Sequence, residues 1–308
     1  MNALRLRTRG GPEALEYGQA PQPSPAEGEI SVLVHAAAVT PTELTWAPTW
    51  TTRAGEARRL PVIPGHEFSG EVDEVGHGVT DLAPGDAIFG MNDWFGDGAQ
   101  AELCVARAVD VASKPRSIDH VAAAATPISA LTAWQGLVER ARLAPGERVL
   151  VHGAAGGVGL FAVQIARGRG AQVIGTASAH NLELVRGLGA HAVIDHRAQR
   201  FEELARDVDV VFDTVGGDTL ARSWAVLGPK GRLVTIAASE EGTRDDRIRD
   251  AFFIVEPDRA QLASMARMID AGELRVLVGA VFPLAAGVRA YRHKPLRGKV
   301  VLAIQSEA

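Results

Sequence analysis

A glycine-rich turn between an apolar strand and an apolar-faced helix constrains the fold of this chain more than any other feature. Within the sequence VLVHGAAGGVG, Ala154, Gly156 and Gly159 have the G-x-G-x-x-G spacing, with alanine in the first place. Gly156 lets the backbone approach a pyrophosphate, and Gly159 allows the helix to pack closely on the strand. Amides at the helix N-terminus, around Gly157 and Val158, would face that anion. The turn predicts that these five residues bind a dinucleotide, and a purely structural tight turn is the alternative.

The chain around this turn alternates strands with helices. Six predicted strands follow Pro145 and Gly146, and helical stretches separate most of them. Such alternation is typical of an α/β fold, a doubly wound parallel sheet that binds its ligand at the carboxyl ends of the strands. The last strand would begin at Ala251 and end at Val255, after a charged loop. The predicted strands are 148–152, 172–176, 192–195, 208–213, 231–236 and 251–255, and the predicted helices are 158–167, 181–188, 218–227 and 259–270.

The first 120 residues have a different pattern. Short strand candidates separated by Gly/Pro turns indicate a β-rich, barrel-like unit. The end of the chain returns to strand character and most simply rejoins this unit, because chain termini often lie close together. The sequence therefore predicts a β-rich domain over 1–120, completed by 275–308, and a dinucleotide-binding domain over 121–274. The strand candidates of the first domain are 29–39, 70–75, 86–89, 100–105 and 299–302.

Composition excludes several classes of protein. The chain has 308 residues, with 37 acidic and 32 basic side chains, and lacks a sustained Lys/Arg cluster, so nucleic-acid binding is not expected. Its one cysteine, Cys104, can form neither an internal disulfide nor a Cys-rich zinc site, which favours a reducing, cytoplasmic compartment. The N-terminus lacks the apolar stretch of a secretory signal. The longest apolar stretch, 276–288, is interrupted by Pro283 and is too short to span a bilayer, so no membrane segment is expected.

The residues after the strand at 172–176 bear on the choice of nucleotide. An NAD-selective site carries an acid about twenty residues beyond the glycine turn, where this chain has Thr176. Hydrogen bonds to a 2′-phosphate, without charge repulsion, can come from Thr176, Ser178, His180 and Asn181. Arg197 could add positive charge. NADPH is therefore favoured over NADH, and the alternative for His180 and Arg197 is that they are ordinary polar loop residues.

Four motifs, in order along the chain, carry a family resemblance: Gly65-His66-Glu67, the AAGGVG turn, DTVGG at 213–217 and GKVVL at 298–302. With these motifs the sequence resembles the medium-chain dehydrogenase/reductase superfamily and, within it, the zinc-independent quinone oxidoreductase branch. The resemblance implies a GroES-like β-rich catalytic domain, a Rossmann domain and an active site in the cleft between them. It also implies a homodimer paired through the strand at 251–255, and an apolar edge strand needs covering in any case.

The resemblance also bears on metal binding. Zinc-dependent relatives hold a catalytic zinc with a cysteine, a histidine and a second cysteine, and the matching positions here are Thr40, His66 and Ile128. Because catalytic zinc sites need about three protein ligands, no metal is expected at these positions. Glu43 matches an acid that braces the histidine, so we interpret His66 and Glu43 as a hydrogen-bonded pair. The alternative is that His66 donates a proton at the cleft.

The resemblance places three threonines at the reaction centre. Thr132 matches a residue that touches the nicotinamide ring, and Thr40 stands where quinone reductases often carry asparagine. Thr42 aligns with a hydroxyl of the proton relay in zinc enzymes. The following segment would offer flat, apolar side chains to an acceptor, namely Trp46, Pro48 and Trp50. The alternative is that the two tryptophans are ordinary core aromatics.

The remaining predicted cofactor contacts lie at the adenosine end and after two later strands. Asn181 and His196 stand where the family carries a lysine and a tyrosine that face the 2′-phosphate, which weakens the expected preference for NADPH. Val215 and Ala237 complete the predicted set.

The sequence thus predicts an NADPH-dependent, metal-free oxidoreductase that transfers hydride to a quinone or an α,β-unsaturated carbonyl. One alternative is a zinc-type alcohol dehydrogenase with substitute ligands. The other is a non-catalytic protein that binds a nicotinamide nucleotide as a sensor.

Overall fold

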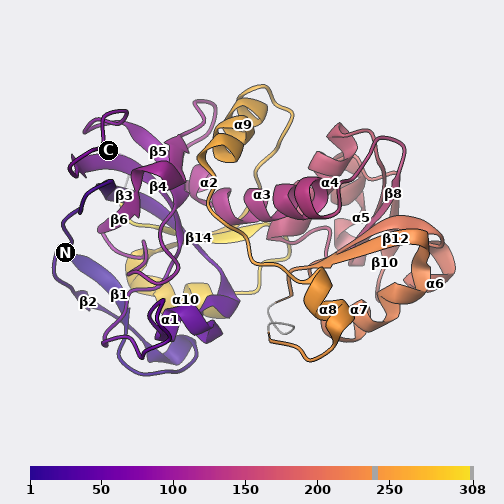
Figure 1. Ribbon diagram of the computed structural model, residues 1–308, viewed down its shortest axis with the longest axis horizontal. Helices are drawn as coiled ribbons and strands as arrows, with labels where there is room; N and C mark the ends of the chain where they lie inside the picture. The colour runs from indigo at the N-terminus through magenta and orange to yellow at the C-terminus, as the bar shows by residue number, and fades with distance from the viewer. Residues whose placement is uncertain (238–241, 306–308) are drawn as a thin grey trace.

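The chain forms two lobes, which the computed structural model describes over residues 1–237 and 242–305 (Figure 1). Both ends of the chain lie in the lobe drawn on the left, and the segments coloured from magenta to orange form the lobe on the right. Within the described ranges, no helix is both long enough and apolar enough to cross a membrane.

The right-hand lobe is built on a parallel sheet with the strand order β10-β9-β8-β11-β12. Alternate residues of β8 enter different apolar clusters, Val149 and Val151 on one face and Leu150 on the other, so both faces of the sheet are buried. The strand order reverses beside β8, which opens a crevice at the carboxyl ends of β8 and β11. The strands are β8 Arg148–Val151, β9 Gln172–Ala177, β10 Ala192–Asp195, β11 Val208–Asp213 and β12 Leu227–Thr235.

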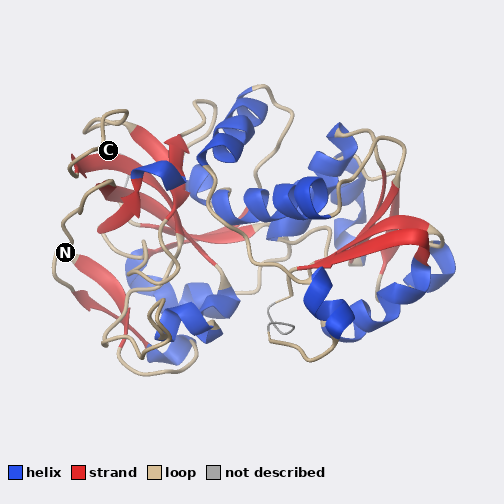
Figure 2. Ribbon diagram, viewed as in Figure 1, coloured by secondary structure: helices blue, strands red, loops and turns tan. Residues whose placement is uncertain are grey.

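Helices cover this parallel sheet (Figure 2). The helix α4 Gly157–Gly168 follows β8 and begins at the glycine turn. Its apolar face shares one cluster with the sheet and with the helix α3 Pro127–Trp134. The other helices are α5 Leu182–Gly187, α6 Phe201–Leu204 and α7 Gly217–Ser223.

The predicted sixth strand of this sheet, 251–255, is wrong. Asp246–Ala251 form helix α8, and the side chain of Asp245 caps it by accepting a backbone N–H of its first turn. After the helix, Phe252 makes only an isolated parallel bridge to Thr235 of β12. The sheet therefore has five strands among the described residues, and most of the charged segment predicted as a loop is helical.

The left-hand lobe contains a seven-stranded sheet. The C-terminal strand β14 pairs antiparallel with β3, which confirms that the end of the chain rejoins the N-terminal part. Its strands are β3 Glu29–Val39, β4 Glu67–Val75, β5 Ala87–Met91, β6 Leu103–Arg107, β7 Val111–Ser113, β13 Val278–Pro283 and β14 Lys299–Ala303, and a separate hairpin is formed by β1 Asn2–Leu6 and β2 Leu15–Gln19. The limits predicted for the two domains stay a prediction.

Further helices join and cover the two lobes. The helix α2 packs on the seven-stranded sheet, where Ala124 shares an apolar cluster with Ala36 and Ala38 of β3. The bounds are α1 Ala47–Trp50, α2 His120–Ala124, α9 Arg259–Asp270 and α10 Gly287–Arg292.

Candidate active site

A cleft of about 990 Å³ lies between the two lobes. Its walls come from the loop after β3, the helices α3 and α4, the carboxyl ends of β11 and β12, and the start of β14. Side chains from both lobes therefore meet in one space. Residues predicted from the sequence that line it are Thr40, Thr42, Thr132, Gly157, Val158, Val215 and Ala237.

The glycine turn has the geometry of an anion-binding site. Gly156 is the N-cap of the twelve-residue helix α4 and provides no side-chain cap to its amides. A Cβ at Gly159 would lie 2.1 Å from the backbone oxygen of Gly153, so only glycine fits that packing. A Cβ at Gly156 would meet only that oxygen, at 3.2 Å, so space remains above the turn. A pyrophosphate fits this backbone cradle at the start of the helix.

A buried polar network supports the turn from below. The ring of His152 contacts the Thr176 hydroxyl at 3.2 Å through Nδ1 and the Ser223 hydroxyl at 3.0 Å through Nε2. Burial lowers the pKa of His152 to about 3, so the ring is neutral at physiological pH. Thr176 is itself buried and hydrogen-bonded to this network. Its hydroxyl therefore positions the turn, and a contact of Thr176 with a 2′-phosphate stays a prediction.

The other residues predicted at the adenosine end gather where β9 and β10 finish. The amide of His196 donates to Ala177 at 3.2 Å, which places the loops after the two strands side by side. The Ser178 hydroxyl is 3.2 Å from Nε2 of the exposed His180, and Arg197 is also exposed. Asn181 is buried and donates to the backbone oxygen of Leu296 at 2.7 Å.

The cleft contains a cation that the sequence analysis missed. Lys299, at the start of β14, donates from Nζ to the Thr40 hydroxyl at 3.0 Å and to the carboxylate of Glu67. Glu67 is fully buried, and it also accepts the backbone N–H of Ile128 at 3.0 Å. The stem of Lys299 lies against Gly157, so this side chain reaches from the glycine turn to Thr40. Burial raises the pKa of Glu67, and the lysine ammonium opposes that shift.

His66 and Glu43 form the predicted pair. Nδ1 of His66 is 2.9 Å from the Glu43 carboxylate, and both side chains are buried. His66 is outside the lining of the cleft, and Trp94, whose ring centroid is 5.1 Å from that of the imidazole, belongs to the lining. Nε2 of His66 lacks a hydrogen-bond partner. The pair is thus confirmed, and a role for His66 in proton transfer stays a prediction.

The side chains around His66 do not fit a catalytic zinc. Thr40 and Ile128 occupy the two positions that match the zinc-binding cysteines of zinc-dependent relatives, and neither side chain supplies a thiolate or an imidazole. The ammonium of Lys299 lies 3.0 Å from the Thr40 hydroxyl, and a positive charge there repels a metal cation.

Aromatic side chains line part of the cleft. The rings of Trp46 and Trp94 meet edge to face with centroids 5.2 Å apart, and Phe95 and Pro48 also belong to the lining. Trp50 is buried elsewhere, and its indole N–H donates to a backbone oxygen, so it does not line the cleft. This chamber suits a flat, apolar molecule.

Thr132 faces the cleft from α3. Its hydroxyl donates to the backbone oxygen of Ile128 at 2.6 Å, which leaves the oxygen lone pairs as acceptors. Thr132 can therefore accept a hydrogen bond from an amide N–H of a bound ligand.

Comparison with known proteins gives consistent matches along the chain. Residues 26–116 match the alcohol dehydrogenase GroES-like domain, and residues 188–302 match a domain described as zinc-binding dehydrogenase. The chain is 30% identical to a probable zinc-binding oxidoreductase, mitochondrial, of Arthroderma benhamiae, over 94% of this chain and 92% of that protein. It is also 30% identical to a quinone oxidoreductase of Rattus norvegicus, over 94% and 93% of the two chains.

The solved structure of the quinone oxidoreductase from Coxiella burnetii superimposes with a TM-score of 0.90 at 27% identity, covering 99% of each chain. The predicted fold class, a Rossmann sheet with a GroES-like domain, is thereby confirmed.

Proposed function

Because the chain belongs to the medium-chain dehydrogenase/reductase superfamily, in its quinone oxidoreductase branch, we propose that it transfers hydride from NADPH to a quinone or an α,β-unsaturated carbonyl, without a metal ion at the active site. One observation carries the proposal. A single cleft is lined by the glycine turn at a helix N-terminus, by aromatic side chains and by Lys299, whose ammonium reaches Thr40.

The residues of the chain divide the task of holding the nucleotide. Backbone amides at Gly157 and Val158 would bind the pyrophosphate, and the stem of Lys299 beside Gly157 brings positive charge close to it. Val215 and Ala237, which follow β11 and β12, would flank the nicotinamide half, and Thr132 would accept a hydrogen bond from the carboxamide. When bound, a reduced nicotinamide supplies the hydride.

The chain also supplies electrostatic help to the acceptor. Negative charge develops on the acceptor oxygen as hydride arrives, and a fixed donor stabilises it most when it is already oriented. The Lys299 ammonium and the Thr40 hydroxyl form such a preorganised donor pair at the cleft wall. Glu67 holds the ammonium in place.

Preference for NADPH over NADH rests on the loops after β9 and β10. Ser178, His180 and Arg197 offer hydroxyl, imidazole and guanidinium groups there. The carboxylate of the nearby Asp195 accepts a hydrogen bond from the backbone N–H of Arg197 at 3.0 Å, and not from its side chain. The Arg197 guanidinium would therefore be available to bind a 2′-phosphate.

We further propose that the chain acts as a homodimer in the cytoplasm. The extended segment after α8 makes only an isolated bridge, from Phe252, to the edge strand of the five-stranded sheet, and a second copy would cover this edge. The compartment is proposed because the single cysteine favours a reducing environment. Sedimentation of the purified protein tests the dimer, and a monomer at micromolar concentration would contradict it.

The test of the function is NADPH oxidation by protein dialysed against a chelator. Quinones, enones, simple aldehydes and alcohols (the last with NADP⁺) are compared at equal concentration. We expect turnover with quinones or enones and no gain when zinc is restored. Turnover confined to aldehydes or alcohols and dependent on zinc would support the zinc-type alternative. Tight NADPH binding without turnover on any acceptor would support a sensor.

A further inference from the structure

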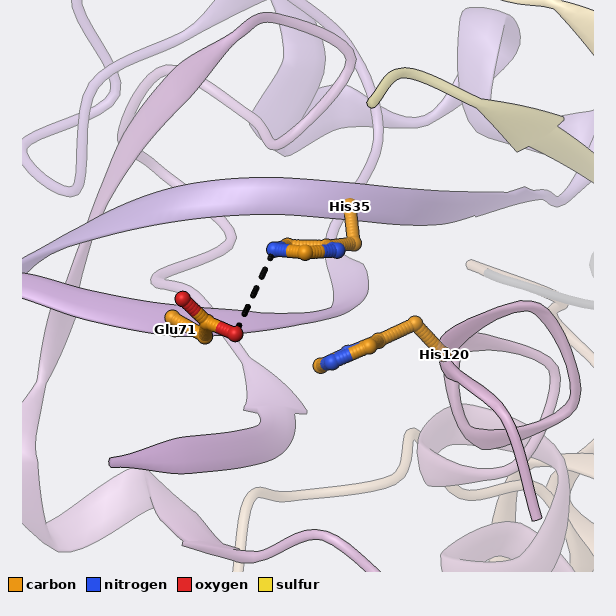
Figure 3. Close-up of side chains that lie close together, drawn as sticks. All are labelled: His35, Glu71 and His120. Atoms are coloured by element: carbon orange, nitrogen blue, oxygen red, sulfur yellow. Dashed lines mark ion pairs between the residues drawn. The ribbon is translucent and has the colours of Figure 1, made fainter. Parts of the chain in front are cut away.

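Two histidines and a glutamate meet on the seven-stranded sheet, outside the lining of the cleft. His35 comes from β3, Glu71 from the adjacent β4, and His120 begins α2, so the three side chains converge from three elements (Figure 3). One ligand atom from each residue lies within 4.8 Å of those from the other two. Within the described residues, this is the only such group of three or more His, Cys, Asp or Glu side chains.

His35 lies at an irregularity of the sheet that sets its direction. The pairs Val34–Gly70 and Ala36–Ser69 leave His35 as an additional residue between them, and such bulges re-aim a side chain. Both ring nitrogens of His35 are buried without a hydrogen-bond partner. A neutral imidazole always carries one N–H and one lone pair, so His35 leaves both a donor and an acceptor unsatisfied.

Hydrogen bonding prepares His120 to be a ligand. The Ser69 hydroxyl donates its hydrogen to the backbone oxygen of Ile88 at 2.9 Å, so it accepts from Nδ1 of His120 at 2.8 Å. The proton of the ring is therefore on Nδ1, and Nε2 keeps its lone pair. A hydrogen-bonded Nδ1–H with a free Nε2 is the arrangement of metal-binding imidazoles.

Glu71 completes the set from the solvent side. Its carboxylate is 3.8 Å from Nε2 of His35, too far for a hydrogen bond, and its side chain is 43% exposed. The two imidazole rings are stacked, with centroids 4.2 Å apart. Ligand atoms around a tetrahedral zinc lie roughly 3.3 Å apart. The three ligand atoms here lie within 4.8 Å of one another, so side-chain rotation would have to bring them about 1–1.5 Å closer together.

We propose that His35, Glu71 and His120 bind one divalent transition-metal ion of the zinc type, with water in the open position. Two imidazoles and one carboxylate are a donor set that zinc and cobalt accept, while calcium and magnesium prefer oxygen ligands. The ion would satisfy one nitrogen of His35 and would tie β3, β4 and α2 together. The site is independent of hydride transfer, because none of its residues lines the cleft.

Calorimetric titration of chelator-treated protein with Zn²⁺ tests the proposal, with Co²⁺ as a spectroscopic probe. We expect one ion per chain and the visible absorption of four-coordinate cobalt. Glu71→Gln and His120→Gln should each weaken zinc binding by about tenfold or more. Because Glu71 is partly exposed, Glu71→Gln keeps the fold, and zinc should raise the Tm of the parent protein more than that of this variant.

The matched control is His77→Gln. His77 also stands 3.8 Å from a glutamate, Glu27, but that pair is highly exposed and lacks a third ligand, so this variant should bind zinc like the parent. Absence of zinc binding at 100-fold excess, or equal affinity in Glu71→Gln and His120→Gln, would overturn the proposal. Zinc binding that is lost in Glu43→Gln and kept in Glu71→Gln would overturn it as well, by placing the ion at His66.

Discussion

Replacing Lys299 by methionine isolates the charge that this lysine brings to the cleft. Methionine keeps most of the apolar stem beside Gly157 and removes the ammonium that binds Thr40 and Glu67. The carboxylate of Glu67 would then be buried with only the N–H of Ile128 as a partner. The variant should therefore lose stability, and its acceptor reduction should slow.

The magnitude follows from the burial of the pair. The side chains of Glu67 and Lys299 are 1% and 10% exposed, so water cannot replace the lost partner. Removing one member of such a pair costs about 3–5 kcal/mol. In a domain of this size that corresponds to a fall in Tm of about 6–20 °C. Pairing Lys299→Met with Glu67→Gln removes the unpaired charge and should recover more than half of the loss.

Thermal unfolding of the parent, both single variants and the double variant at pH 5 and pH 8 is the assay. Without the ammonium, the folded-state pKa of Glu67 rises further above its unfolded value, because the lysine no longer opposes the effect of burial. A carboxyl whose folded pKa is raised favours the folded state at low pH, and this contribution disappears as pH rises through that pKa. Lys299→Met should therefore be less destabilised at pH 5 than at pH 8.

Two outcomes would refute this reasoning. One is a Lys299→Met variant whose Tm falls by less than about 2 °C, because a buried, unpaired carboxylate cannot cost so little. The other is a double variant no more stable than Lys299→Met, which would mean that the loss does not come from the charge left on Glu67.

Two further substitutions test the nucleotide site. Gly159→Ala should lower the free energy of unfolding by about 1–3 kcal/mol and weaken NADPH binding, because its Cβ would meet a backbone oxygen at 2.1 Å. The control is Gly168→Ala in the same helix, where the added Cβ has open space and should stabilise the protein by about 0.5–1 kcal/mol. Chemical denaturation and NADPH titration compare the two variants, and equal effects would refute the packing argument. Ser178→Asp should lower the affinity for NADPH relative to NADH by about tenfold through repulsion of the 2′-phosphate, and an unchanged ratio in fluorescence titrations would place the adenosine end elsewhere.

Local patterns predicted most of the nucleotide-binding lobe. The expected strand at 208–213 and helix at 259–270 match β11 and α9 at both ends, because apolar periodicity and side-chain caps are properties of adjacent residues. The strand expected at 251–255 is wrong because two local patterns overlap there. The segment is apolar, but Asp245 caps the start of a helix that runs to Ala251, and beyond this helix Phe252 makes only one bridge to the sheet.

The candidate site was predictable only in part. Thr40, Thr42 and Thr132 reach one cleft, and the His66–Glu43 pair forms as expected. The ion pair between Lys299 and Glu67 joins residues 232 positions apart, and no local spacing announces such a contact. The network under the turn was hidden likewise, because the burial of Thr176 depends on side chains from other strands and helices.

The central claim is that a pyridine nucleotide lies across the glycine turn and reaches the cleft. Calorimetric titration of NADPH into the parent protein and into Gly156→Val tests it most directly. The added Cβ would meet only one backbone oxygen, at 3.2 Å, and the two methyl groups would occupy the space above the turn. We predict one nucleotide per chain in the parent and at least about tenfold weaker binding in the variant, with an unchanged circular dichroism spectrum. Equal affinity in the two proteins, or no binding by the parent, would contradict the claim.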